Sequence, residues 1–257
     1  MMRVCALLLA VCASAAQANV ADVARTWTAA QVWLPGTVNA TSVDALNEVE
    51  TPRAVVLYAH GCDGLSRITT VTARFLARAG HLVVAPDGFA RQDKPMSCNA
   101  AQTRGGLHRA VLGWRQDEMH HALARLRGTD ALDGAPIILM GHSEGAITVA
   151  TIDAPDAALR IIEGWTCHAG WPEYRGLNAP EDQPVLALVG EDDPWFRQPV
   201  LSGDCGAFMQ GEAQVSQVYR APDYLAGKHW LSMDKDVREL ILEFVASHLP
   251  PEAYGQE

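Results

Sequence analysis

Short, almost continuous apolar runs recur along this chain, and segments with helical spacing lie between them. The runs at 53–60 (RAVVLYAH) and 136–140 (PIILM) are typical of strands buried on both faces of a sheet. Further strands are expected at 81–86, 159–165, 184–190 and 214–219, an edge strand at 26–34, and helices at 70–79, 107–127, 145–151 and 234–248. This alternation predicts a parallel α/β sheet covered by helices.

The bulk composition limits the partners that the protein can have. Of its 257 residues, 49% are hydrophobic, so the chain can bury a sizeable core. The net charge is −10 and no basic run occurs, which argues against binding to nucleic acid. There is no internal repeat or linker, so we expect residues 19–257 to form a single domain.

Residues 1–18 have the pattern of a signal peptide. Arg3 supplies a positive charge, residues 4–11 are apolar, and Ala16-Gln17-Ala18 is a small-residue cleavage site. Cys12 could instead carry a lipid, but the bulky Val11 before it disfavours that reading. No later stretch approaches the ~20 apolar residues of a membrane span. We expect an exported protein, periplasmic or secreted, without a membrane span.

Export changes how the cysteines are interpreted. Four remain after residue 18, namely Cys62, Cys98, Cys167 and Cys205. An even number in an oxidising compartment predicts two disulfides, although four cysteines allow three connectivities. None of the four forms a CxxC pair, so a zinc cluster is not expected. We expect neither a metal nor a cofactor.

The motif that indicates chemistry is GHSEG at 141–145, directly after a predicted buried strand and before a helical segment. It matches G-x-S-x-G, in which a serine nucleophile sits on a sharp strand-to-helix turn. Such a turn strains the serine backbone, and side chains at 141 and 145 would collide with the adjoining elements. Ser143 is therefore the candidate nucleophile.

A serine hydroxyl needs a base and an acid to orient that base. In this arrangement the base follows the last strand and precedes the final helix, where His229 lies; His168 is the rival. The acid is expected in Glu191-Asp192-Asp193, after the strand at 184–190. Asp193, next to Pro194, is preferred, and Asp192 is the alternative. The order Ser143, Asp193, His229 is that of the α/β-hydrolases.

Acyl transfer also needs N–H donors for the oxyanion that forms on the attacked carbonyl. One should be the backbone N–H of Glu144, directly after the nucleophile. The other should come from the loop His60-Gly61-Cys62-Asp63-Gly64, where the N–H of Cys62 is the candidate. Cys62 could itself be a nucleophile, but no base is placed for it.

Five segments together resemble the dienelactone hydrolase family of the α/β-hydrolases. They are LYAHGCDGLS (57–66), VVAPDGFAR (83–91), GHSEG (141–145), LVGEDDPW (188–195) and GKHW (227–230). The resemblance implies an α/β-hydrolase fold, with a mostly parallel central sheet and helices on both faces. Founding members have a cysteine nucleophile where this chain has Ser143, which favours a general serine ester hydrolase over a dienelactone-specific enzyme.

The implied fold also suggests how the cysteines pair. In it, the strands before Cys62 and Cys98 are neighbours, as are those before Cys167 and Cys205, so these are the expected disulfides. Loops 88–105 and 166–182 would shape the substrate pocket. We expect a small-molecule ester, or a lactone, as substrate. A serine peptidase of the same fold and a non-catalytic binding domain are the alternatives.

Overall fold

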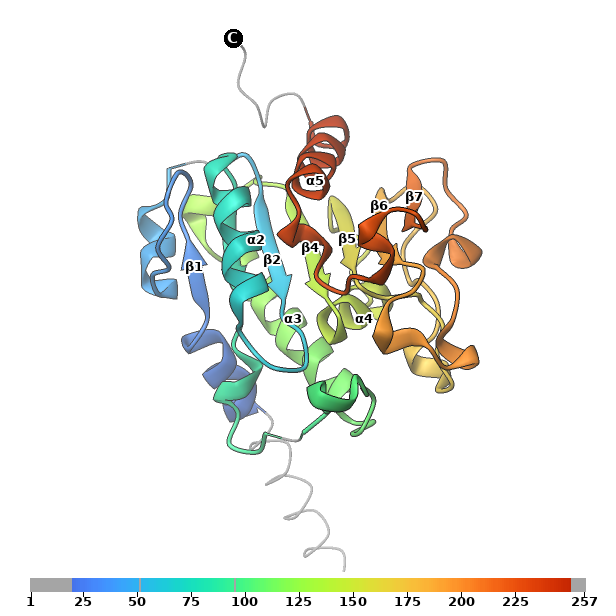
Figure 1. The fold of residues 1–257 in the computed structure, drawn as a ribbon. Helices are drawn as coiled ribbons and strands as arrows, with labels where there is room; N and C mark the ends of the chain where they lie inside the picture. Colours follow the sequence, from blue (N-terminus) through green and yellow to red (C-terminus); the bar gives the residue numbers. More distant parts are fainter. Residues whose placement is uncertain (1–19, 51, 95, 251–257) are drawn as a thin grey trace, which may run out of the picture.

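The protein is described by a computed structural model for residues 20–50, 52–94 and 96–250; the predicted signal peptide, 1–18, lies outside these residues. Its centre is a seven-stranded sheet of order β1-β3-β2-β4-β5-β6-β7 (Figure 1). The strands are β1 (Gln31–Trp33), β2 (Val55–Ala59), β3 (Leu82–Ala85), β4 (Ile137–His142), β5 (Leu159–Glu163), β6 (Val185–Gly190) and β7 (Gln214–Tyr219). Only β1 is antiparallel to its neighbour.

Helices cover both faces of the sheet. Figure 1 shows α2 (Arg67–Arg78) and α5 (Lys235–His248) on one face, and α3 (Val111–Arg127) and α4 (Glu144–Thr151) on the other. Two separate hydrophobic clusters match these two faces. The parallel α/β prediction and the predicted fold class, that of the α/β-hydrolases, are confirmed.

The apolar runs of the sequence are continuous because successive side chains of a strand enter different clusters. In β2, Val55, Leu57 and Ala59 pack with α3 and α4, whereas Val56 and Tyr58 pack with α2 and α5. All five side chains are buried.

The prediction of an edge strand at 26–34 is wrong for most of its length. Residues 20–28 are helical, and β1 covers only Gln31–Trp33. The buried side chains of Val23 and Trp27 are four residues apart, which is helical spacing. In addition, the hydroxyl of Thr28 donates to the carbonyl oxygen of Ala24 at 3.0 Å. The residues 26–34 therefore combine the end of a helix with a short strand.

The order of the strands places a crevice at one edge of the sheet. The chain leaves β2 towards β3, but it leaves β4 in the opposite direction, towards β5. A crevice opens at the carboxyl ends of two such strands and is the usual ligand site of open α/β sheets. The Cys62 loop follows β2, and Ser143 follows β4. Among the described residues, no helix is long and apolar enough to cross a bilayer.

Candidate active site

Ser143 occupies a strained turn between β4 and α4. Its backbone has φ 57° and ψ −118°, a conformation that few residues other than glycine adopt. A Cβ atom at Gly141 would lie 2.2 Å from the carbonyl oxygen of Gly145, and one at Gly145 would lie 1.9 Å from that of Ala59. Both glycines of the motif are therefore required by close backbone approach, as the sequence indicated.

His229 lies on the loop between β7 and α5, and Asp193 directly follows β6. The Nδ1–H of His229 donates to Oδ2 of Asp193 at 2.6 Å. Asp193 is buried and accepts a second hydrogen bond from the backbone N–H of Trp195 at 3.0 Å. Because the carboxylate accepts from Nδ1, the lone pair of the imidazole is left on Nε2.

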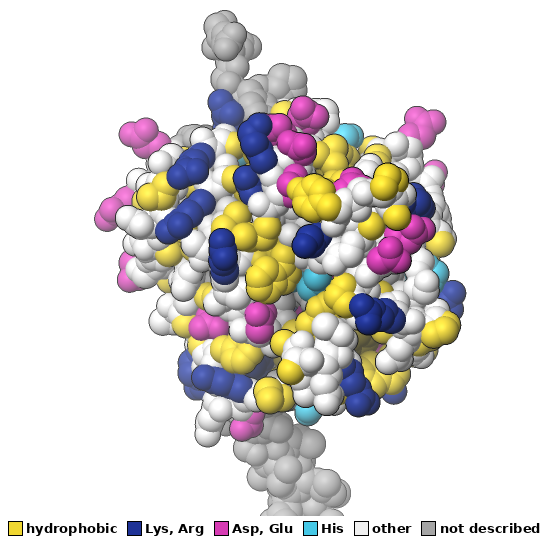
Figure 2. All heavy atoms as spheres, in the orientation of Figure 1, with side chains coloured by type: hydrophobic (Ala, Val, Ile, Leu, Met, Phe, Trp, Pro, Cys, Tyr) yellow, Lys and Arg dark blue, Asp and Glu magenta, His cyan; other side chains and the backbone are white. Residues whose placement is uncertain are grey.

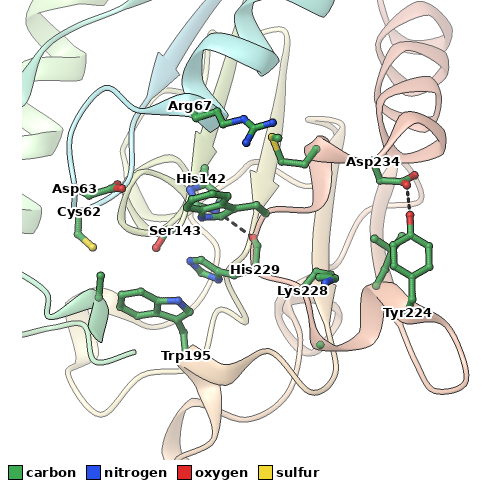
Figure 3. A pocket seen from close by; sticks show the side chains of 15 residues that line it. Cys62, Asp63, Arg67, His142, Ser143, Trp195, Tyr224, Lys228, His229 and Asp234 are labelled. Atoms are coloured by element: carbon green, nitrogen blue, oxygen red, sulfur yellow. Dashed lines mark hydrogen bonds between the residues drawn. The ribbon is translucent and has the colours of Figure 1, made fainter. Parts of the chain in front are cut away.

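Ser143 and His229 line the same hollow, which Cys62 and Trp195 also border. In Figure 3 the serine hydroxyl and the imidazole both point into this hollow. Nε2 of His229 is buried and has no hydrogen-bond partner among the described residues. The structure thus places Ser143 and His229 in one hollow, with Asp193 bonded to the imidazole and the lone pair of Nε2 unoccupied.

The two rival residues have other surroundings. Asp192 is exposed, and its backbone N–H donates to the carbonyl oxygen of Ala226 at 2.8 Å. The ring of His168 packs edge-on against Phe208, 5.0 Å between ring centres, and it is not among the residues that line the hollow of Ser143.

The predicted oxyanion donors border the serine from two elements. A Cβ atom on Gly61 would lie 3.5 Å from Cβ of Ser143, so the Cys62 loop passes close to the nucleophile. Glu144 is the first residue of α4, where backbone N–H groups have no partner within the helix and favour negative charge. The disulfide Cys62–Cys98 anchors the first of these two elements.

A buried charged network supports the Cys62 loop from behind. Arg115 on α3 donates to Nε2 of His60 at 2.8 Å and to the carbonyl oxygen of His60 at 3.1 Å. Glu118 holds Arg115 at 2.9 Å and Arg91 at 2.5 Å. Burial and then the charge of Arg115 lower the pKa of His60 well below its ordinary value. His60 is therefore neutral and structural, a role that sequence reasoning did not find.

His142, inside the GHSEG motif, holds the loop that carries His229. Its Nε2–H donates to the backbone carbonyl oxygen of His229 at 3.1 Å, and the two rings meet edge-on at 4.8 Å. Burial, followed by the nearby His229, lowers the pKa of His142 well below its ordinary value. The ring is neutral and positions the candidate base.

Glu163, at the end of β5, is a second residue that the sequence did not reveal. Its side chain is fully buried, and Oε1 accepts from the backbone N–H of Ser232 at 2.7 Å. Burial raises the pKa of Glu163 from its ordinary value of 4.5 to about 7, although the hydrogen bonds from Ser232 lower it. The available signal was a single acid at the end of the strand segment Leu159–Glu163, which also carries Arg160.

The four cysteines form the two expected disulfides, Cys62–Cys98 and Cys167–Cys205. Both lie at the carboxyl edge of the sheet, and such bonds are typical of an oxidising compartment. Among the described residues, no group of three or more His, Cys, Asp or Glu side chains is arranged to hold a metal ion.

The sheet, its helices and the strained serine define an α/β-hydrolase fold. XC6422 from Xanthomonas campestris, an α/β serine hydrolase without a lid, matches with a TM-score of 0.57 and 15% identity over 86% of this chain and 89% of its own. Esterase Pf2001 from Pyrococcus furiosus matches with a TM-score of 0.56 and 13% identity over 77% and 84%.

A Klebsiella pneumoniae protein assigned provisionally to the dienelactone hydrolases matches with a TM-score of 0.51 and 15% identity, over 78% of this chain and 88% of its own. At the level of fold, the chain is thus similar to the dienelactone hydrolase-like α/β serine hydrolases that its motifs resemble. No family model and no curated protein matches its sequence.

Proposed function

We propose that this chain is an exported serine hydrolase that cleaves carboxylic esters, with Ser143 as nucleophile, His229 as base and Asp193 as the residue that orients the base. The observation that carries the proposal is the 2.6 Å hydrogen bond from His229 to Asp193, made beside a serine held at φ 57° in the same hollow. Esterase Pf2001, one of the structural neighbours, supports the same class of reaction.

In the first half of the reaction, Nε2 of His229 takes the proton of the Ser143 hydroxyl as Oγ attacks the ester carbonyl. The carbonyl oxygen becomes negative and accepts hydrogen bonds from the N–H groups of Cys62 and Glu144. Asp193 stabilises the imidazolium. The bond to the alcohol oxygen then breaks, His229 returns the proton to that oxygen, and the acyl group remains on Ser143.

In the second half, a water molecule replaces the alcohol. His229 takes a proton from the water as its oxygen attacks the acyl carbonyl, and the same two N–H groups hold the oxyanion. The bond to Oγ of Ser143 then breaks, and the proton returns to the serine through His229. The products are one carboxylic acid and one alcohol, and the enzyme is regenerated.

The compartment and domain structure belong to the same proposal. Removal of residues 1–18 would leave residues 19–257 as one domain in the periplasm or outside the cell. The two disulfides support this location because cytosolic thiols are kept reduced.

Hydrolysis of p-nitrophenyl acetate by the purified chain tests the proposed activity. The wild-type chain should release p-nitrophenol with saturable kinetics, and Ser143→Ala should reduce kcat to the background rate while the circular dichroism spectrum stays the same. Equal rates for both proteins, or no hydrolysis by a folded wild-type chain, would refute the proposal.

A further inference from the structure

Two hollows, rather than one, meet at Ser143. The first, of about 580 Å³, contains His229, and we term it the histidine arm. The second, of about 640 Å³, extends in another direction over α4, and we term it the aromatic arm. Cys62, Ser143 and Trp195 border both. An ester bond placed at Ser143 therefore has room for a substituent on each side.

Trp195 forms the partition between the two arms. Its ring stacks on the imidazole of His229, with 5.2 Å between centres and 25° between planes. The backbone N–H of Trp195 is fixed by Asp193 at 3.0 Å, so the partition is attached to the acid that orients the base. The histidine side of this wall belongs to the first arm, and the other side opens into the second.

Two edge-to-face ring pairs line the aromatic arm, which Arg104 and Arg197 also border. Trp165 meets Phe196 with 5.6 Å between ring centres, and Trp171 meets Tyr174 with 5.2 Å. The guanidinium of Arg109 lies 5.5 Å from the centre of the Trp171 ring and braces it from outside. These pairs come from segments that follow β5 and β6, so the arm is preformed by the fold.

The histidine arm is lined by charged side chains as well as aromatic ones. Arg67, Tyr224, Lys228 and Asp234 line it beside Trp230; Asp234 is half-buried and the other four are exposed. Figure 3 shows Lys228 on the side of His229 away from Cys62, and Arg67 above His142. On the face shown in Figure 2, hydrophobic side chains gather near the centre with Lys and Arg side chains around them. Charged side chains therefore border this arm together with aromatic ones.

Proton transfer decides which part of the substrate enters which arm. The leaving alcohol oxygen must receive its proton from Nε2 of His229, which lies in the histidine arm. The acyl group extends from the carbonyl carbon in the other direction. We propose that the aromatic arm binds the acyl group, and that the preferred substrates are esters of bulky aromatic carboxylic acids with the alcohol in the histidine arm.

The chemistry of the arm favours such an acid over an aliphatic one. Flat rings bury large areas and gain further energy from offset or edge-to-face contacts with other rings. The acyl group also stays in place through both halves of the reaction, whereas the alcohol must leave before water attacks. A preformed arm bordered by aromatic rings suits the first role, and the arm that contains the proton donor His229 suits the second.

This assignment rests on the proposed function and is tested by acyl selectivity. The measured quantity is the ratio of kcat/KM for p-nitrophenyl 2-naphthoate to kcat/KM for p-nitrophenyl acetate. Each kcat/KM is first divided by the rate constant for hydrolysis of the same ester by hydroxide, which corrects for the reactivity of the ester itself. Trp171→Ala should lower this ratio about tenfold, because one large ring contact is lost. Trp171→Leu keeps an apolar side chain for folding but removes the ring, and it should lower the ratio in the same direction.

Trp230→Ala is the matched control because it removes the same side chain from the other arm. It should change the acyl ratio by less than about twofold, and should instead change the ratio for 2-naphthyl acetate over phenyl acetate. An acyl ratio that stays constant in both Trp171 variants, or that falls in Trp230→Ala instead, would overturn the assignment while ester hydrolysis stands. A wild-type chain that cleaves neither acyl ester would refute the proposed function itself.

Discussion

The backbone N–H of Ser143 donates to the carbonyl oxygen of Glu163 at 2.9 Å. The side chain of the same glutamate accepts from the backbone N–H of Ser232, three residues after His229. Glu163 therefore joins the nucleophile turn to the loop that carries the base. Two segments 86 residues apart (229 − 143) are fixed through one buried residue on the strand between them.

The buried carboxyl of Glu163 should make stability depend on pH. Its pKa is raised from 4.5 to about 7, so between these values the folded chain keeps a proton that the unfolded chain has released. The contribution of the protonated carboxyl to the free energy of unfolding is fully present below pH 4.5 and is lost as pH rises through about 7. The total loss is about 3 kcal/mol. Urea unfolding at pH 5 and pH 8 measures this loss.

Glu163→Gln is the variant that isolates the effect. Its amide oxygen can still accept from Ser232, but the titrating proton is gone, so the variant should lose about 2 to 3 kcal/mol less than the wild type between pH 5 and pH 8. The neighbouring titratable groups Tyr58, Tyr219 and His229 are present in both proteins. An identical pH dependence in both proteins would show that Glu163 does not titrate in this range.

The two adjacent acids after β6 should differ sharply in their effect on catalysis. Asp193→Asn should lower kcat on the order of 10³ to 10⁴-fold, because an amide does not fix the required tautomer of His229 or stabilise its charge. Asp192→Asn is the matched control; this side chain is exposed, and the cost should be far smaller. Steady-state kinetics on p-nitrophenyl acetate would contradict the assignment if the ranking were reversed.

The same substitution at two helical glycines should have opposite effects. Gly145→Ala puts a Cβ atom 1.9 Å from the carbonyl oxygen of Ala59, so it should destabilise the fold by about 3 kcal/mol or more and displace Ser143. Gly113→Ala on α3 meets nothing within 4 Å and should stabilise by about 0.5 to 1 kcal/mol. Thermal unfolding compares them. A Gly145→Ala variant as stable as the wild type would refute the close-approach argument.

The disulfides should leave the processed chain without free thiols. Each closes a loop with a sequence separation of 36 or 38, which corresponds to roughly 3 to 4 kcal/mol in the chain-entropy model. Reduction should therefore lower the melting temperature, and loss of Cys62–Cys98 should also lower kcat because Cys62 borders Ser143. Thiol titration of the denatured, unreduced chain measures this directly, and two or more reactive thiols would contradict the two-bridge structure.

Local patterns predicted the parts of the site that depend on local geometry. The spacing of GHSEG indicated the turn at Ser143, and chain order indicated where Asp193 and His229 lie. The hydrogen bonds that hold the site from distant segments have no local sequence pattern that could have predicted them. Arg115 holds His60 from 55 residues away, and Glu163 reaches Ser232 across 69. Residues 26–28 were misread as the start of a strand because the alternation of Thr26, Trp27 and Thr28 also fits the end of the helix at 20–28.

Covalent labelling of Ser143 tests the central claim most directly. A fluorophosphonate probe reacts with a serine only when a neighbouring base activates it. We predict that peptide mass spectrometry of the labelled wild-type chain finds the probe on Ser143, and that Ser143→Ala carries none while keeping its fold. A probe attached to another residue, labelling that persists in Ser143→Ala, or no labelling of the folded wild-type chain would contradict the account.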